Sequence, residues 1–294
     1  MARILLSVPT LDGSPEALAG HEVVEGPPGS NARAEGLLCA PVMPVGAEAI
    51  AAMPALRAIG VAGAGTDAID LDATRARGIE VLTAGEALVE TTADLAFALI
   101  LSAARLTGEA EAVLRSGRWA GWGFFETFGR DVSGSTLGLV GYGAIGRAVA
   151  RRAGAFAMEV LHHTRTPTGE PGWREDLDSL LAESDIVSLH VPLTDSTRGL
   201  IDARRIDLIG PSGVLVNTAR GAVVDEQAVA AALGDGRLLA AGLDVYTLEP
   251  NVAPELLRAP RAVLLPHIGS ATTATRRAML SLAAERLARF LAAA

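Results

Sequence analysis

Three side chains in the second half of the sequence have the types that carry substrate binding and proton transfer. Arg220 follows one apolar run, His267 follows another, and Glu249 lies between them in a short loop before a proline. An arginine guanidinium binds a carboxylate through two hydrogen bonds and polarises a nearby carbonyl. A histidine exchanges a proton near neutral pH, and an adjacent carboxylate favours its charged form. Each residue alone has an ordinary structural explanation, so their functional interpretation depends on the sequence motif that precedes them in the chain.

A glycine motif of the form G-x-G-x-x-G precedes these residues, with Gly141, Gly143 and Gly146 at its fixed positions and Ala144 and Ile145 between them. An apolar run comes before the motif and a helical pattern follows it. The first glycine permits a tight turn, the second lets the backbone approach a pyrophosphate, and the third lets the helix pack on the strand. The sequence therefore predicts a dinucleotide held at a helix N-terminus.

The end of the next predicted strand, 159–163, indicates which dinucleotide is preferred. An NAD site typically has Asp or Glu here, which accepts a hydrogen bond from the ribose 2′-hydroxyl. This chain has Thr164 and Arg165 instead. Loss of the acid removes repulsion of a 2′-phosphate and the arginine supplies a matching cation, so NADP(H) is predicted to be preferred and NAD(H) remains possible. The alternative is that Arg165 only stacks on adenine.

Apolar runs separated by helical segments place these residues in a layered α/β fold. Residues 1–97 predict a smaller α/β unit, and from residue 136 strands and helices alternate as in a doubly wound parallel-sheet (Rossmann) domain. The final segment, from 270, predicts one long helix that can return to the first unit. The expected strands are 3–8, 36–43, 56–61 and 78–82, then 137–141, 159–163, 186–191, 214–217, 240–243 and 262–265.

Composition excludes several classes of function. The 294 residues carry a net charge of −9, which argues against nucleic acid as a partner, and all 25 basic residues are arginine. Without lysine there is no Schiff-base or P-loop chemistry. The single cysteine, Cys39, excludes a disulfide framework, and no H-E-x-x-H motif indicates a metal. The short apolar N-terminus and the absence of an apolar run of about 18 residues predict a cytoplasmic protein without a membrane span.

A glycine- and aromatic-rich segment, 117–125, stands out from a chain with 4% aromatic residues. It contains Trp119, Trp122, Phe124 and Phe125. One interpretation is a surface loop with a few packed rings. The other is an arm that packs on another subunit or closes over a site.

Together these segments resemble the D-isomer-specific 2-hydroxyacid dehydrogenases over nearly the whole chain. The matching segments are 65–70 (GTDAID), 135–146 (STLGLVGYGAIG), 188–194 (SLHVPLT), 216–221 (VNTARG), 243–250 (LDVYTLEP) and 266–269 (PHIG). The resemblance implies a Rossmann cofactor domain, 98–269, and a discontinuous smaller α/β substrate domain, 1–97 plus 270–294. It also implies a homodimer.

The same resemblance implies roles for individual residues. Arg220 would orient the substrate, His267 would act as acid and base, and Glu249 would be the partner of His267. Backbone amides of Ala64 and Gly65 would bind the substrate carboxylate, and Asp244 would hold the nicotinamide carboxamide. Further cofactor contacts are implied for Val191, Pro192, Thr197, Thr218, Ala219 and Gly269.

The tryptophan-containing segment and Thr164-Arg165 look most like the glyoxylate/hydroxypyruvate reductase branch, in which a Trp of the neighbouring subunit, here Trp122, can reach the substrate. The implied reaction is reduction of a small 2-keto acid to a D-2-hydroxy acid. Ala144 replaces a frequent arginine, which removes one pyrophosphate contact. Two alternatives stay open: a 3-phosphoglycerate dehydrogenase-like enzyme, and a non-catalytic NAD(H)-sensing protein that resembles the family's corepressors.

Overall fold

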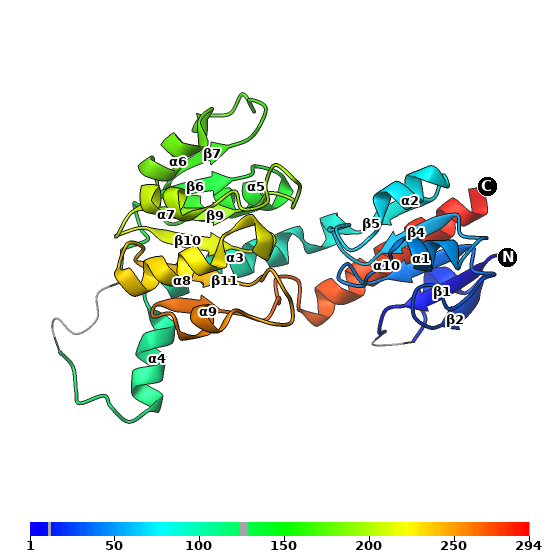
Figure 1. The fold of residues 1–294 in the computed structure, drawn as a ribbon, viewed down its shortest axis with the longest axis horizontal. Coiled ribbons are helices and arrows are strands. Elements are labelled where there is room, and N and C mark those ends of the chain that lie inside the picture. The colour runs from blue at the N-terminus through cyan, green and yellow to red at the C-terminus, as the bar shows by residue number, and fades with distance from the viewer. Residues whose placement is uncertain (11–12, 124–128, 294) are drawn as a thin grey trace. The chain divides into compact units, whose positions relative to one another are not determined.

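The structure, a computed structural model, describes residues 1–10, 13–123 and 129–293. The chain divides into two compact units: unit 1 comprises 1–91 and 270–294, and unit 2 comprises 92–269 (Figure 1). The sequence placed the boundary after residue 97. It lies instead after Thr91, near the start of helix α3 (Val89–Ala104), because most of that helix packs within unit 2.

Unit 1 contains a five-stranded parallel sheet in the order β2-β1-β3-β4-β5. Side chains alternate between its faces: Ile4 and Leu6 belong to one buried cluster and Leu5 to the other. The elements are β1 (Arg3–Ser7), η1 (Glu16–Leu18), β2 (Glu22–Glu25), β3 (Gly36–Cys39), α1 (Ala47–Ala51), β4 (Ala58–Val61), α2 (Leu71–Ala76), β5 (Glu80–Thr83), η2 (Gly85–Leu88) and α10 (Thr273–Ala293).

The C-terminal helix α10 completes the core of unit 1. Ala283, Leu287 and Leu291 are buried in the same cluster as Ile4 and Leu6. A Cβ at Gly60 on β4 would lie 3.1 Å from the carbonyl oxygen of Ala283, so a glycine lets the helix approach the sheet closely. The expectation of one long helix that returns to the first unit is confirmed for residues 273–293.

Unit 2 contains a seven-stranded parallel sheet in the order β12-β11-β10-β9-β6-β7-β8. The chain runs outward from β6 to β8 and then crosses to β9 on the other side of β6, which creates a switch point where ligands bind in such sheets. The strands are β6 (Thr136–Val140), β7 (Glu159–His163), β8 (Trp173–Arg174), β9 (Ile186–Leu189), β10 (Val214–Asn217), β11 (Ala240–Leu243) and β12 (Ala262–Leu264).

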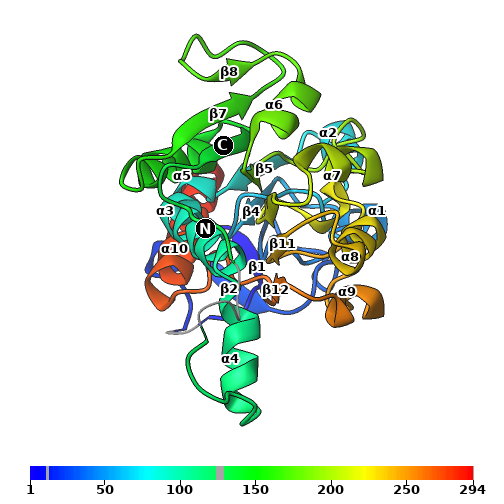
Figure 2. The same ribbon diagram turned by 90° about the vertical axis from the view of Figure 1, so that its left-hand side faces the viewer.

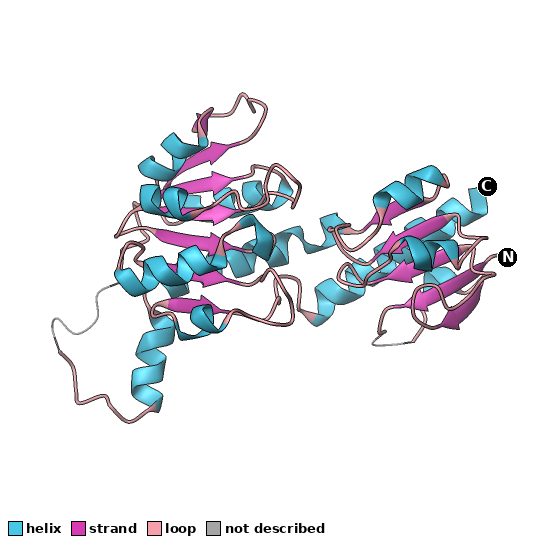
Figure 3. Ribbon diagram, in the orientation of Figure 1, coloured by secondary structure: helices cyan, strands magenta, loops and turns pink. Residues whose placement is uncertain are grey.

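Helices cover both faces of this sheet. Figure 2 shows α3 and α5 on one side of the strands and α7 and α8 on the other, and Figure 3 shows the strands of the sheet side by side with helices packed beside them. These elements confirm a doubly wound domain. The remaining helices are α4 (Thr107–Arg115), α5 (Ala144–Gly154), α6 (Leu177–Glu183), α7 (Ala203–Ile209), η3 (Gly221–Val223), α8 (Glu226–Asp235) and α9 (Pro254–Arg258).

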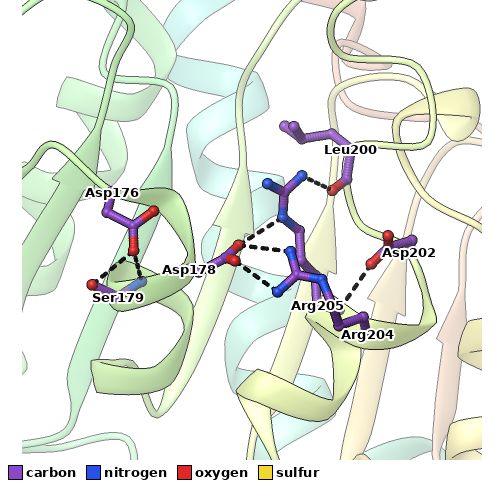
Figure 4. A network of polar contacts seen from close by, with 7 residues as sticks. All are labelled: Asp176, Asp178, Ser179, Leu200, Asp202, Arg204 and Arg205. Carbon is purple, nitrogen blue, oxygen red and sulfur yellow. Dashed lines mark hydrogen bonds and ion pairs between the residues drawn. The ribbon is translucent and has the colours of Figure 1, made fainter.

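A polar network joins α6 to α7 (Figure 4). Asp178 on α6 accepts hydrogen bonds from Arg204 at 2.7 Å and from Arg205 at 2.9 Å. These bonds hold the pKa of the Asp178 carboxyl down at about 2. Asp176 and Asp202 cap the two helices by accepting backbone N–H groups three residues ahead. The network fixes α6 relative to α7.

One helical stretch, Gly85–Ala104, is long and apolar enough to cross a membrane by length and composition, contrary to the expectation from the sequence. Half of it is buried within the protein, including Leu99 and Ile100. Phe97 packs against Phe156 with ring centroids 4.8 Å apart, and a Cβ at Gly242 on β11 would lie 3.1 Å from Leu99. These contacts explain the apolar composition of the stretch as that of a core helix.

Candidate active site

The glycine motif forms a tight turn between β6 and α5. Gly141 has φ +98°, and a Cβ there would lie 2.6 Å from the carbonyl oxygen of His190. A Cβ at Gly146 would lie 2.4 Å from the carbonyl oxygen of Gly141. The first and third glycines are therefore required by close contacts of the protein with itself.

Gly143 differs, because a Cβ there would meet nothing within 4 Å. It is the N-cap residue of α5, no side chain caps that helix, and its first turn carries no acidic residue. The first amides of a helix have no partner within it and carry partial positive charge. Open space beside uncapped amides is what a pyrophosphate requires. The first turn of α5, with Ala144 and Ile145, thus fits the predicted cofactor.

The end of β7 presents the two residues that replace the expected acid. Thr164 Oγ1 donates to the carbonyl oxygen of Thr166 at 2.7 Å. Arg165 is exposed and has no ion-pair partner among the residues that the structure describes. A free cation at this strand end is available to a ligand phosphate.

The end of β9 lies directly beneath the glycine turn. His190 Nε2 and Ser188 Oγ are 2.9 Å apart, and burial lowers the pKa of His190 to about 4, so this histidine is neutral. Val191 and Pro192 follow, and Thr197 Oγ1 donates to the Pro192 carbonyl oxygen at 2.6 Å. Of the predicted contacts in this segment, Val191 adjoins the glycine turn, because its amide nitrogen would lie 3.0 Å from a Cβ at Gly141.

The end of β10 shapes the loop that carries Arg220. The buried Asn217 accepts from the Ala219 amide at 3.0 Å and donates to the Arg220 carbonyl oxygen at 2.9 Å. Nη1 of Arg220 donates to the Ala219 carbonyl oxygen at 2.7 Å. Thr218 Oγ1 is buried without a partner among the described residues, and an orphaned hydroxyl here fits a ligand group. The sequence did not single out Asn217, although a polar residue closing an apolar strand was a usable signal.

His267 and Glu249 form a direct pair. Nδ1 of His267 lies 2.7 Å from Oε2 of Glu249. Because a carboxylate only accepts, Nδ1 carries the proton of this bond and Nε2 is left for a reacting group. Oε1 of Glu249 accepts from the Tyr246 amide at 2.9 Å, so the carboxylate is itself held in place.

Asp244 fixes the loop of His267. Its carboxylate is buried, and its two oxygens accept from the amides of Ile268 and Gly269, each at 2.8 Å. The His267 amide donates to the Asp244 carbonyl oxygen at 2.9 Å, and His267 has φ +53°. Burial raises the pKa of Asp244, against the effect of the two amides. The role of Asp244 toward nicotinamide stays a prediction; the structure adds that it positions the histidine loop.

A hydrogen bond of Tyr246 also holds the loops after β11 and β12 together, and it was not predicted from the sequence. The hydroxyl of Tyr246 donates to the carbonyl oxygen of Leu265 at 3.0 Å, which ties the loop after β11 to the loop after β12. Burial raises the pKa of this hydroxyl to about 12, so it remains a donor. A lone tyrosine beside Asp244 gave no pattern that could reveal this bond.

The comparisons with known proteins identify the family of this chain. Residues 97–269 match the model of the D-isomer specific 2-hydroxyacid dehydrogenase, NAD binding domain. The chain belongs to the D-isomer-specific 2-hydroxyacid dehydrogenases. It is an oxidoreductase with a domain for a nicotinamide dinucleotide, and this confirms the family inferred from the motifs.

Several relatives are named glyoxylate reductase or glyoxylate/hydroxypyruvate reductase. A glyoxylate reductase of Thermococcus litoralis is 43% identical over 81% of this chain and 74% of its own length. A glyoxylate/hydroxypyruvate reductase B of Pectobacterium atrosepticum is 42% identical over 80% of this chain and 75% of its own length. The crystal structure of an NADPH-dependent glyoxylate/hydroxypyruvate reductase of Sinorhizobium meliloti is 36% identical, covers 99% of this chain and 95% of its own, and has a TM-score of 0.89.

The predicted site residues are distributed over both units. Arg220, Glu249 and His267 lie in unit 2, at the carboxyl ends of β10, β11 and β12. Ala64 and Gly65 lie in unit 1, just after β4, where Ala64 is exposed. Phe124 and Phe125 of the aromatic segment lie outside the described residues.

Proposed function

We propose that this protein uses NADPH to reduce glyoxylate or hydroxypyruvate to the corresponding 2-hydroxy acid, which has the D configuration in the case of hydroxypyruvate, whose product is chiral. The observation that carries the proposal is the contact of His267 Nδ1 with Glu249 Oε2 at 2.7 Å, in a domain whose glycine turn fits a dinucleotide. The names of the relatives support the substrate class. When bound, the nicotinamide supplies the hydride that the keto carbon accepts.

The residues of the chain then perform binding and proton transfer. The guanidinium of Arg220 binds the substrate carboxylate and polarises the keto oxygen. Nε2 of His267 donates a proton to that oxygen as it gains negative charge, because Nδ1 is engaged with Glu249. The carboxylate of Glu249 stabilises the charged imidazole before the transfer and fixes its orientation. In the reverse direction Nε2 accepts the proton from the hydroxy acid.

The cofactor preference rests on the end of β7. Arg165 is exposed and unpaired among the described residues, and no acid occupies position 164. A 2′-phosphate there gains a charge-assisted bond and meets no carboxylate from the strand end. The Sinorhizobium meliloti structure is described as NADPH-dependent, in line with this preference.

Unit 1 is proposed as the substrate domain, with the amides of Ala64 and Gly65 as carboxylate donors. Both residues follow the buried strand β4, where short side chains leave the backbone accessible. Two adjacent amides provide directional donors without a side chain that would fill a small-substrate site.

A homodimer is also proposed, formed partly by α4 and the segment after it. None of the residues of α4 is buried, and Figures 1 and 2 show this helix projecting from unit 2. Leu114, Trp119 and Trp122 are 60%, 58% and 81% exposed. Such apolar exposure favours burial against a second copy. Light scattering of the purified protein tests this: a monomer at micromolar concentration contradicts it, and so does an unchanged dimer after Leu114→Glu together with Trp119→Ser.

The activity test is NADPH oxidation with a panel of 2-keto acids. Wild type is expected to oxidise NADPH with glyoxylate or hydroxypyruvate. His267→Ala is expected to lower kcat by at least about 100-fold, since general acid catalysis contributes roughly that factor or more. His21→Ala, in a loop of unit 1, is the matched control. Activity on no 2-keto acid, or equal activity in His267→Ala, refutes the proposal.

A further inference from the structure

A carboxylate that the sequence did not reveal lies beside the nucleotide turn. Glu170 belongs to the loop after β7, the same loop that begins with Thr164 and Arg165. It forms an ion pair with Arg147 on the first turn of α5. The end of the second strand and the first turn of the helix are the elements that flank the adenosine ribose in this fold. The ion pair therefore links the helix α5 to the loop after β7, the two elements expected on either side of the ribose.

Aromatic stacking holds the arginine of this pair. The guanidinium carbon of Arg147 lies 4.6 Å from the ring centroid of Tyr142, the second residue of the glycine turn. The Tyr142 ring stacks on His162 of β7, with centroids 3.8 Å apart and planes at 18°. Arg147 is thus fixed over the turn by a cation–π contact as well as by Glu170.

The loop of Glu170 is also tied to β7. The Glu170 amide donates to Thr168 Oγ1 at 3.2 Å, and the same oxygen lies 2.7 Å from Nε2 of His162. Burial lowers the pKa of His162, so this ring adds no positive charge. The bond from Arg147 holds the pKa of the Glu170 carboxyl below its usual value, so Glu170 is charged at neutral pH. Arg147 and Glu170 are thus both charged, and Arg165 lies at the start of the same loop as Glu170.

We propose that Glu170 moderates the choice between NADPH and NADH, which rests on the NADPH preference proposed above. Its negative charge opposes a ribose 2′-phosphate and occupies Arg147, which otherwise adds a second cation for that phosphate. The same carboxylate accepts a hydrogen bond from a 2′-hydroxyl. Arg165 favours NADPH, Glu170 opposes it, and the wild-type protein accepts both cofactors.

Binding without substrate tests this directly. The dissociation constants of NADP⁺ and NAD⁺ are measured by calorimetry for wild type, Glu170→Gln and Arg147→Gln. Glu170→Gln is expected to bind NADP⁺ about five-fold more tightly and NAD⁺ no more tightly, since one charge near a phosphate at a solvated site contributes roughly that factor. Arg147→Gln leaves Glu170 uncompensated, so NADP⁺ is expected to bind about five-fold more weakly or worse.

The two variants distinguish charge from structure. If the ion pair only stabilises the loop, breaking it from either side weakens both dinucleotides alike, and that outcome overturns the proposal. An unchanged NADP⁺ to NAD⁺ ratio in Glu170→Gln also overturns it. Glu183→Gln is the matched control, because Glu183, at the end of α6, pairs with Arg174 at similar exposure, 46% against 41% for Glu170. No keto acid is present, so a failure of the proposed activity does not alter this result.

Discussion

Alanine substitutions at three glycines of one turn and helix are expected to separate folding from cofactor binding. Gly146→Ala places a Cβ 2.4 Å from the carbonyl oxygen of Gly141, a backbone atom that cannot rotate away. Gly143→Ala places a Cβ in space that the protein leaves empty, beside the uncapped N-terminus of α5. Gly154→Ala, at the exposed end of the same helix, meets nothing within 4 Å and serves as the control.

The magnitudes follow from these contacts. An ordinary carbon–oxygen contact is about 3.4 Å or more, so Gly146→Ala displaces α5 by about 1 Å, and such overpacking costs about 1–3 kcal/mol. For a domain of this size that lowers Tm by roughly 2–4 °C per kcal/mol. Gly143→Ala changes only a cap preference, less than about 1 kcal/mol. It obstructs the pyrophosphate, however, and loss of one or two bonds of about 1.5 kcal/mol raises the Kd about 10- to 100-fold.

Thermal unfolding without cofactor and calorimetric binding of NADP⁺ measure the two effects. We expect Gly146→Ala to lower Tm and weaken binding, Gly143→Ala to weaken binding at nearly unchanged Tm, and Gly154→Ala to bind normally with an equal or higher Tm. Normal NADP⁺ affinity in Gly143→Ala would show that the pyrophosphate does not approach this turn. That result refutes the assignment of the open space beside α5 to the cofactor.

Three further outcomes test the positioning of the site. Glu249→Gln is expected to lower kcat about 100-fold with little change in Tm, because the partner of His267 loses its charge but not its shape; an unchanged kcat contradicts the pairing role. Asp244→Asn places an amide donor against one of two backbone donors, so kcat should fall, and an Asp244→Asn enzyme with normal kcat contradicts the positioning role. Asp178→Asn is expected to remove about 1 kcal/mol of unfolding free energy with kcat unchanged. Because the folded pKa of Asp178 is depressed to about 2, the difference from wild type should be complete above about pH 4 and vanish as the pH falls toward 2, as acid-dependent unfolding can show.

The sequence predicted those parts of the fold that local patterns determine. Strands β7, β10 and β11 have the expected bounds. β10 and β11 are buried along their whole length, and short apolar runs between turn residues are typical of such strands. It missed β2, where Glu22 and Glu25 flank only two apolar residues, and the two-residue strand β8. Both strands lie at the edge of a sheet, where one side has no neighbouring strand. Such a strand does not need a continuous apolar run.

The same distinction applies to the site. Residues at strand ends were accessible to prediction, because the carboxyl ends of parallel strands meet at one edge. The contacts of Glu170 with Arg147 and of Asp244 with the amide of Gly269 were not. Those partners are 23 and 25 residues apart, and their meeting depends on how whole loops pack, which no local periodicity encodes.

The geometry of the proton donor is determined within unit 2 alone. The backbone of His267, at φ +53°, is held by the carbonyl oxygen of Asp244, and the two following amides are held by the carboxylate of the same residue. Its ring is oriented by Glu249, which the amide of Tyr246 holds in turn. A left-handed backbone conformation is costly for a residue with a side chain, and the hydrogen bonds around this loop maintain it. The orientation of Nε2 therefore does not depend on unit 1, and substitutions near Ala64 in unit 1 should alter KM more than kcat.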